Sequence, residues 1–280
     1  MSFLVFSIIC SVIVAVLLKV FRGYGVDIKQ AVAFNYVMAI SLSFLLLKPT
    51  LSLDTLSAHW GIFSALGILL PSVFIIMSRA VEAAGIVRYD AAQRLSLVIP
   101  IIASFTLFGE SLSHTRIISL AVAFLALICL LSKPSQGSAT HRHAPFYLLL
   151  VWLGFGLVDI LFKQMSKTGT AFSATLTISF AIAGSLIFLY LFAQGTRFNL
   201  PSIVAGLLLG AFNFGNIYFY IKAHQAYKES PTLVFASMSI GVICLGTLVG
   251  AAIFEERISK LNALGIVLAI IAVLLINYWR

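Results

Sequence analysis

The pattern that decides the fold occurs twice, as FGESLSHTRIISLAVAFLALICLL at residues 108–131 and as FEERISKLNALGIVLAIIAVLLI at residues 254–276. Each copy begins with Phe, has Glu two positions later and Ser three positions after that, and then continues as an apolar run. Glu110 in the first copy therefore matches Glu256 in the second. Because the copies end the two halves of the chain, they predict an internal repeat.

Other parts of the two halves align in the same order. Residues 65–84 align in sequence with residues 208–227, in a register that pairs Gly67 with Gly210. The first apolar run of each half also ends near a lysine. Identity between the halves is low, but the order of matched features holds over most of both halves. We therefore interpret the chain as a duplicated unit.

The composition is that of a protein that crosses a membrane several times. Of the 280 residues, 61% are hydrophobic and only 10% are charged, whereas soluble domains average roughly 25% charged residues. Most of the lysines and arginines behind the net charge of +9 lie between apolar runs, where they set membrane topology, so no nucleic-acid partner is implied. A membrane helix needs about 20 mostly apolar residues. Ten stretches qualify, at residues 2–21, 30–47, 59–83, 88–109, 115–132, 145–163, 172–194, 201–225, 231–254 and 260–279.

Ten spans in two halves give each half an odd number of spans. The second half must then enter the membrane in the opposite orientation to the first. The predicted fold class is an all-α integral membrane protein with ten transmembrane helices, arranged as two inverted five-helix repeats. The first repeat covers residues 1–132, a polar linker covers residues 133–144, and the second repeat covers residues 145–280. Inverted repeats are typical of secondary transporters.

Four features of the chain together resemble a known family. They are the Glu that ends each half's fourth span, the lysine near the end of each half's first span (Lys19 and Lys163), the small residues of the fifth spans, and the five-plus-five span count. In these features the chain resembles the EamA branch of the drug/metabolite transporter superfamily. The resemblance implies a carrier that works by alternating access, with a central cavity lined mainly by the first four helices of each half.

The start of the fourth span departs from this family, in which the region is usually rich in small neutral residues. Residues 85–100 read GIVRYDAAQRLSLVIP, with Asp90, Gln93 and Arg94 close together. The apolar run that follows Arg94 has 14 residues. Such a run is about 21 Å long as a helix, too short for a hydrocarbon core of about 30 Å. The helix must begin earlier, which places Arg94 inside the membrane and Asp90 near its boundary.

These fourth-span residues are the first candidate site. A charge inside the membrane is costly unless it faces a cavity or a partner, and is therefore a functional candidate. We expect Arg94, Asp90 and Gln93 to bind substrate or line its pathway, and Arg94 favours a carboxylate-bearing solute. The alternative for Arg94 is that its side chain extends to the lipid headgroups.

The eighth span carries a second candidate site. Asn213, Asn216, Tyr220 and His224 are spaced by three, four and four residues, so they form one polar stripe along a helix. The first three are candidates for binding a polar solute by hydrogen bonds. Hydrogen bonding between helices is the alternative for the two asparagines.

Two ionisable residues are candidates for carrying a coupling proton. Asp159, in the sixth span, is a carboxylate that could take and release a proton, and His224 titrates near neutral pH. The alternatives are a structural ion pair between Asp159 and Lys163, which are four residues apart, and a solvated position for His224 near its helix end.

No catalytic residue, cofactor or metal site is predicted. Cys10, Cys129 and Cys244 each stand alone in an apolar run. The sequence contains no G-x-x-x-x-G-K-[ST], H-E-x-x-H or G-x-S-x-G motif. Transport is therefore expected to be secondary and not driven by ATP bound to this chain.

The predicted function is a secondary transporter, acting as an exporter, for small polar or anionic metabolites such as amino acids. The alternatives are a flippase for an amphiphilic lipid-linked substrate and an integral membrane enzyme. The predicted partners are a small-molecule substrate, the lipid bilayer and coupling protons, and the chain acts as a monomer or homodimer. We expect a multi-pass protein of the cell (inner) membrane with both termini on one side. The resemblance implies cytoplasmic termini, whereas a small excess of Lys and Arg in the loops after odd-numbered spans favours the other side.

Overall fold

The computed structural model describes residues 2–21, 24–50, 53–84, 86–111, 113–131, 143–254 and 260–278. Within these residues the chain is all helical, without a β-strand, which confirms the predicted all-α class. The helices are α1 (Ser2–Phe21), α2 (Ile28–Leu42) with its π-helical continuation η1 (Ser43–Leu47), α3 (Leu53–Ala84), α4 (Ile86–Leu95), α5 (Val98–Thr106), α6 (His114–Leu131), α7 (Ala144–Ser166), the short 3-10 helix η2 (Gly169–Ala171), α8 (Phe172–Ala193), α9 (Leu200–Ala226), α10 (Pro231–Phe254) and α11 (Lys260–Tyr278).

Most of these helices have the length and composition of membrane spans. Among the described residues, seven segments are long and apolar enough to cross a membrane: Ser2–Phe21, Ile28–Leu47, Ser57–Ala84, Ala144–Ser166, Phe172–Ala193, Leu200–Ala226 and Pro231–Ile253. Three shorter apolar helices lie at Ala91–Thr106, Ile117–Cys129 and Ala263–Ala272. Each of the ten stretches expected from the sequence falls on one of these segments. The structure therefore supports a multi-pass membrane protein, and the count of ten spans stays a prediction.

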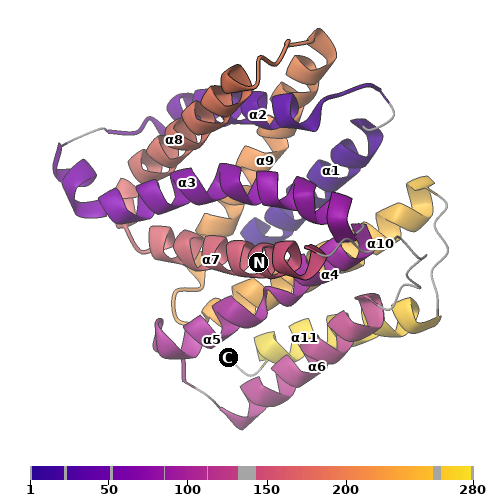
Figure 1. The fold of residues 1–280 in the computed structure, drawn as a ribbon. Coiled ribbons are helices and arrows are strands. Elements are labelled where there is room, and N and C mark those ends of the chain that lie inside the picture. The colour runs from indigo at the N-terminus through magenta and orange to yellow at the C-terminus, as the bar shows by residue number, and fades with distance from the viewer. Residues whose placement is uncertain are drawn as a thin grey trace.

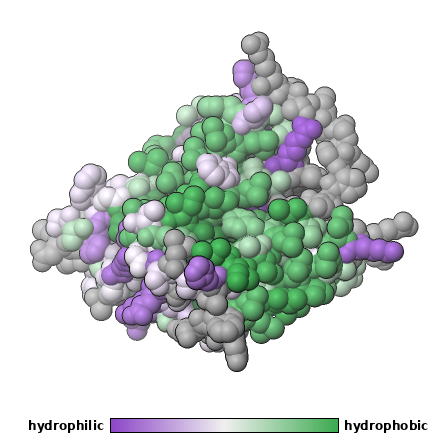
Figure 2. All heavy atoms as spheres, turned by 90° about the horizontal axis from the view of Figure 1, so that it is seen from below, coloured by the Kyte–Doolittle hydropathy of each residue, from purple (hydrophilic) through white to green (hydrophobic). Residues whose placement is uncertain are grey.

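The outer surface of the bundle is apolar, as a lipid-facing surface should be. Figure 2 shows a broad hydrophobic face with hydrophilic residues gathered towards its margins. Large hydrophobic side chains of α6 and α11 are exposed, namely those of Ile117, Ile118, Leu125, Ile128, Leu261, Leu264, Val267, Ile270, Ile271 and Leu274. In water such a surface would drive aggregation, so its natural environment is the hydrocarbon of a bilayer.

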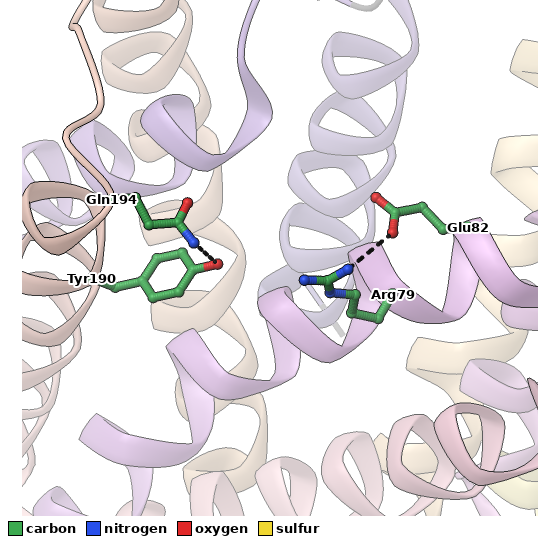
Figure 3. Close-up of polar contacts among 4 residues, drawn as sticks. All are labelled: Arg79, Glu82, Tyr190 and Gln194. Atoms are coloured by element: carbon green, nitrogen blue, oxygen red, sulfur yellow. Dashed lines mark hydrogen bonds and ion pairs between the residues drawn. The ribbon is translucent and has the colours of Figure 1, made fainter. Parts of the chain in front are cut away.

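Polar pairs occur near the ends of α3 and α8 (Figure 3). Arg79 Nη1 lies 3.7 Å from Glu82 Oε2, and both side chains are more than half exposed. Gln194 Nε2 donates a hydrogen bond to Tyr190 Oη at 2.8 Å. Exposed pairs of this kind add little stability, so the packing of the helices must come from other contacts.

The closest packing joins α2 to α9. A Cβ atom at Gly206 would lie 2.5 Å from the carbonyl oxygen of Ala31, and one at Gly210 would lie 2.5 Å from the carbonyl oxygen of Asn35. The two glycines are four residues apart, which is the G-x-x-x-G spacing that lets membrane helices approach closely. Since increasing residue numbers in α9 meet increasing numbers in α2, the two helices run parallel.

The helix contacts follow a reciprocal pattern, with each helix of the first half corresponding to one of the second half (α1 to α7, α2 to α8, α3 to α9, α4 and α5 to α10, α6 to α11). α1 packs on α9 and α10, and α7 packs on α3, α4 and α5. α2 packs on α9, and α8 packs on α3. α6 and α11 pack on each other and lie side by side at one edge of the bundle (Figure 1). Exchanging each helix with its counterpart reproduces these pairs.

α2 and α8, which correspond to each other, are also in contact and run antiparallel. Lys29 near the start of α2 lies over the ring of Tyr190 near the end of α8, at 5.9 Å. Further along α2, the Tyr36 ring lies 6.3 Å from the ring of Phe180, nearer the start of α8. Antiparallel contact between matching helices is the geometry that a two-fold axis across the bundle produces.

The fourth expected span is divided into α4 and α5, whereas the sequence predicted one helix. Pro100 has no N–H, so it cannot bond to the Ser96 carbonyl, which instead accepts from the N–H of Ile99 at 3.0 Å. The carbonyl of Leu95 thereby loses its helical donor and accepts from Trp152 Nε1 of α7 at 3.0 Å. The division is therefore fixed by a proline and satisfied by a neighbouring helix.

We predict that Gly210→Ala destabilises the protein by about 1–3 kcal/mol, because the added methyl group meets the α2 backbone and must push the helices apart. Gly246→Ala in α10 is the matched control, since a Cβ there meets no atom within 4 Å. Both substitutions improve helix propensity alike. The measurement is the thermal unfolding midpoint of the purified protein in detergent, and equal midpoints for the two variants would contradict the predicted α2–α9 contact.

Candidate functional site

Polar side chains of α9 form hydrogen bonds with neighbouring helices inside the bundle. It packs against α1, α2, α7 and α10. The residues of its polar stripe, Asn213, Asn216, Tyr220 and His224, each meet a different neighbouring helix. The spacing that predicted a single stripe is present, but the stripe ties four helices together in this conformation.

The two asparagines of the stripe bond to other helices. Asn213 Nδ2 donates to Asn35 Oδ1 of α2 at 3.0 Å, and Asn216 Oδ1 accepts from Ser7 Oγ of α1 at 2.9 Å. In membranes such bonds contribute on average about 0.6 kcal/mol. Asn35 is fully buried, and its own Nδ2 has no hydrogen-bond partner in the structure, so this layer retains an unused amide donor.

Asp159 and Tyr220 form the next layer, between α7 and α9. Tyr220 Oη donates to Asp159 Oδ1 at 3.0 Å. The Tyr220 side chain is buried, and its ring meets Phe162 edge-on at 6.2 Å. Asp159 is half-buried, and among the described residues the donor to its carboxylate is the neutral Tyr220 hydroxyl. A carboxylate partly removed from water with a neutral donor is poorly compensated. This makes Asp159 a natural place for a proton or a cationic group to bind.

His224 lies one turn beyond Tyr220 and is completely buried. Its ring lies 4.8 Å from the ring of Tyr220 and 4.7 Å from that of Phe235 in α10. Neither ring nitrogen has a hydrogen-bond partner among the described residues. The solvated position considered for His224 is therefore wrong, because α10 covers the end of α9 and removes the ring from water. An imidazole without partners in a dry site is costly, which makes it a functional candidate.

Lys163 is also buried, with 1% of its surface exposed. Its Nζ donates to the main-chain carbonyl of Lys228, in the turn between α9 and α10, at 3.1 Å. It lies 6.0 Å from the centre of the Phe108 ring. Asp159 and Lys163 thus direct their polar groups to α9 and to the α9–α10 turn respectively.

Glu110 reaches the same turn from the other side. It follows α5 and is held to it by a hydrogen bond from its own N–H to the carbonyl of Ser104 at 2.9 Å. Its carboxylate is buried and accepts from the N–H of Thr232 at 3.0 Å and from the Thr232 hydroxyl. The second residue of α10 has no helical acceptor for its N–H, so Glu110 caps α10 from a different helix.

The fourth-span candidates lie on α4, which packs on α3 and α7. Arg94 is in the last turn of α4, immediately before the division of the span, and is half-buried, as is Gln93. Asp90 is in α4, but its side chain lies outside the described part of the structure. α4 begins at Ile86, so the expectation that the helix starts well before Arg94 is confirmed.

The structure thus brings together Asp159, Tyr220 and His224. Asn213 and Asn216 lie in the neighbouring layer, nearer the start of α9. Arg94 and Gln93 lie apart, on α4. Within the described residues no group of three or more His, Cys, Asp or Glu side chains could hold a metal ion. The arrangement can bind polar groups and protons.

Sequence reasoning did not name Glu110 and Lys163 as site residues. They served only to mark the repeat, and Lys163 was considered as an ion-pair partner of Asp159. The signal that could have found them is that each has a counterpart in the other half, Glu256 and Lys19, although loops at helix ends usually vary.

Comparison with known proteins agrees with this architecture. Residues 143–278 match the model of the EamA-like transporter family. An uncharacterized protein of Haemophilus influenzae (strain ATCC 51907 / DSM 11121 / KW20 / Rd) is 54% identical over 282 aligned positions, which cover 98% of this chain and 97% of that protein. One crystal structure shares the fold with a TM-score of 0.78 at 14% identity, over 99% of this chain and 96% of its own. The chain belongs to the EamA-like transporter family of the drug/metabolite transporter superfamily.

Proposed function

We propose that this protein is a secondary transporter that exports small polar or anionic metabolites such as amino acids by alternating access. On this proposal residues 1–132 and 145–280 are inverted five-helix repeats that cross the inner membrane ten times, and residues 133–144 link them. Membership of a family of membrane transporters supports the general function. The proposal adds the direction, the substrate class and the mechanism.

The observation that carries the proposal is the antiparallel contact between the matching helices α2 and α8, within a packing pattern that repeats when the halves are exchanged. Two copies of one unit in opposite orientations can adopt two slightly different packings and exchange them, which opens the site to each side in turn. The contact pattern supports this arrangement. An exchange of the two packings would not need a large change in which helices are neighbours.

Individual contacts support the same register. A Cβ at Gly154 of α7 would lie 2.8 Å from Val73 of α3, and one at Gly215 of α9 would lie 3.1 Å from Cys10 of α1. Gly154 and Cys10 lie on the first helices of the two halves, and Val73 and Gly215 lie on the third helices. Both contacts therefore join the first helix of one half to the third helix of the other half. The glycine lies on the first helix in one contact and on the third helix in the other.

The substrate class is inferred from Arg94. A half-buried guanidinium at the division of a helix can bind a carboxylate by two parallel hydrogen bonds. Helices interrupted near the middle of a membrane often border transport sites. The amide groups of Asn213, Asn216 and Gln93, together with the Tyr220 hydroxyl, could orient the remaining polar groups of a small metabolite.

Energy coupling is assigned to Asp159 and His224. Within the described part of the chain, the Asp159 carboxylate accepts from the neutral Tyr220 hydroxyl, and neither nitrogen of His224 has a hydrogen-bond partner. Each can therefore gain a proton without breaking an ion pair. We place both termini on the cytoplasmic side, which a C-terminal reporter fusion would test.

We predict that cells lacking the protein retain, and cells overproducing it release, a small set of carboxylate-bearing metabolites. The measurement is metabolite profiling of cells and medium with stable-isotope labelling, which reports substrate and direction together. Accumulation of lipid-linked precursors with unchanged soluble metabolites would favour the flippase instead, and a new product made from an exogenous precursor would favour an enzyme.

We predict that Arg94→Gln lowers transport efficiency for the identified substrate by at least about tenfold, because a hydrogen bond to a charged group contributes roughly 1.5–3 kcal/mol. Arg94→Lys should lose less transport efficiency. The methyl ester of the substrate has no carboxylate charge, so the variants should transport it equally well. Arg88→Gln, which removes an exposed arginine from the same helix, is the matched control. Unchanged transport by Arg94→Gln at normal protein levels would show that Arg94 only anchors the helix.

We predict that Asp159→Asn abolishes substrate accumulation driven by a pH gradient while it preserves exchange of substrate across the membrane. The amide retains the size of the side chain and can still accept from Tyr220, but it cannot carry a proton. The measurement compares gradient-driven uptake with counterflow in proteoliposomes, and Glu82→Gln is the control. Loss of both activities would instead indicate a structural or substrate-binding role for Asp159.

A further inference from the structure

The turn between α9 and α10 is held from two sides by buried charged residues. Glu110 accepts from the N–H and hydroxyl of Thr232 at the start of α10. Lys163 donates to the carbonyl of Lys228 just after α9. The Phe108 ring lies near the ammonium groups of Lys163 at 6.0 Å and of Lys167 at 4.6 Å. These contacts join the end of α5 and the end of α7 to one short turn.

The contacts link the two halves at one end of the bundle. Phe108 and Glu110 follow α5 of the first half, whereas α7, α9 and α10 belong to the second half. α5 and α10 correspond to each other in the repeat and pack together. Separating them at this end is therefore a way to open the bundle between its halves, and the Glu110–Thr232 contact is what resists it.

The chemistry of these contacts favours two discrete states. Glu110 is 7% exposed and Lys163 is 1% exposed. A buried charge without its partner is strongly unfavourable, whereas a charge in water needs none. A partly opened turn would take from both charges their hydrogen bonds to the turn while they remain out of water. The turn is therefore stable either closed with its contacts made or fully open to water.

The turn also controls access to the buried histidine. His224 lies in the last turn of α9 with no exposed surface, and no described residue forms a hydrogen bond with its ring. Phe235, on the first turns of α10, lies against its ring at 4.7 Å. Water and protons can reach His224 from this end only when α10 moves away from α9 and α7.

We propose that Glu110 and Lys163 are positioning residues that hold the α9–α10 turn closed, and that release of this clamp opens the carrier at the end where its termini lie. α1 runs antiparallel to α9, since Ser7 meets Asn216 and Phe3 packs on Phe219, so the N-terminus is at the clamp end. The inference rests on the proposed alternating access and adds the device that closes one end. It assigns a closing role to the Glu and Lys that recur in both halves.

The test uses two single-cysteine reporters in a protein whose Cys10, Cys129 and Cys244 are replaced by serine. Ser237→Cys places a thiol at a buried position about one and a half turns into α10 from Thr232. Ala91→Cys places one at the half-buried position of α4 that corresponds to Ser237 when Glu110 is aligned with Glu256. The initial rate of labelling by a membrane-impermeant maleimide is measured in sealed vesicles of each orientation.

We expect Glu110→Gln and Lys163→Met each to raise labelling of the Ser237→Cys reporter by about tenfold or more, from the termini side only. Glu110→Gln replaces a charged acceptor with a weaker, neutral one, and Lys163→Met removes the charged donor to the Lys228 carbonyl. Labelling of the Ala91→Cys reporter should stay equal or fall, since opening one end closes the other. Combining Glu110→Gln with Thr232→Val should raise labelling by less than the product of the two single effects, because both weaken the same contact.

The matched controls remove equivalent charges outside the clamp. Glu82→Gln takes away an exposed carboxylate of α3, and Lys48→Met takes away an exposed lysine that follows η1. Each should change labelling by less than about twofold, as expected for exposed charges. Thermal unfolding midpoints report separately on whether the variants remain folded.

Two results would overturn the clamp. Equal acceleration of both reporters would mean that the substitutions only loosen the fold, and unchanged labelling of the Ser237→Cys reporter would mean that the contacts do not close this end. The labelling needs no substrate. Absence of any transported metabolite in the profiling experiment would therefore count against the proposed function, and the labelling result would still decide whether the clamp exists.

Discussion

The close approach of α9 to α2 is the contact on which the rest of the structure depends. Helices in a bilayer gain nothing from burying apolar surface against each other instead of lipid, so they associate through close packing and polar bonds. Gly206 and Gly210 bring α9 against the backbone of α2. This approach lets Asn213 reach Asn35, and it sets the position of α9 against α1, α7 and α10. Tyr220 and His224 are placed by the same contact.

The backbone groups that helix ends and interruptions leave unpaired become tertiary contacts. The Leu95 carbonyl, released near Pro100, accepts from Trp152 of α7. The Thr232 N–H, released by the start of α10, donates to Glu110, which is fixed to α5. Because lipid offers no hydrogen bonds, each such group needs a partner from a neighbouring helix. The division of the fourth span and the α9–α10 turn are thus also the places where helices are tied together.

The helices could be predicted from the sequence because their apolar runs are long and punctuated by Gly, Pro and charged residues. The position of Arg94 within a helix also followed, since it depended only on length. The division of the fourth span did not, because Pro71 lies within the uninterrupted α3 while Pro100 borders a division, and the difference depends on neighbours. The burial of His224 was missed for a similar reason, since only the packing of α10 over α9 removes the ring from water.

The two halves match in the order of several sequence features but differ in their polar residues, and this difference separates two kinds of residue. In the register that pairs Gly67 with Gly210, the positions in α3 that correspond to the stripe of α9 are apolar: Leu70, Val73, Met77 and Val81. Two pairs of residues recur in the sequence of both halves, Glu110 with Glu256 and Lys19 with Lys163. Of these, Lys19, Glu110 and Lys163 lie near helix ends.

A carrier that alternates must close both ends in turn but needs only one site for its solute and its proton. Closing residues should therefore be duplicated with the repeat, whereas binding residues are free to specialise in one half. The residues of this chain fit this distinction. The sequence repeats the Glu and the Lys in both halves, whereas Asp159, Tyr220 and Arg94 are not duplicated. In the proposed carrier, the substrate is recognised by groups that occur in one half only, and the ends are closed by groups that the proposed repeat duplicates.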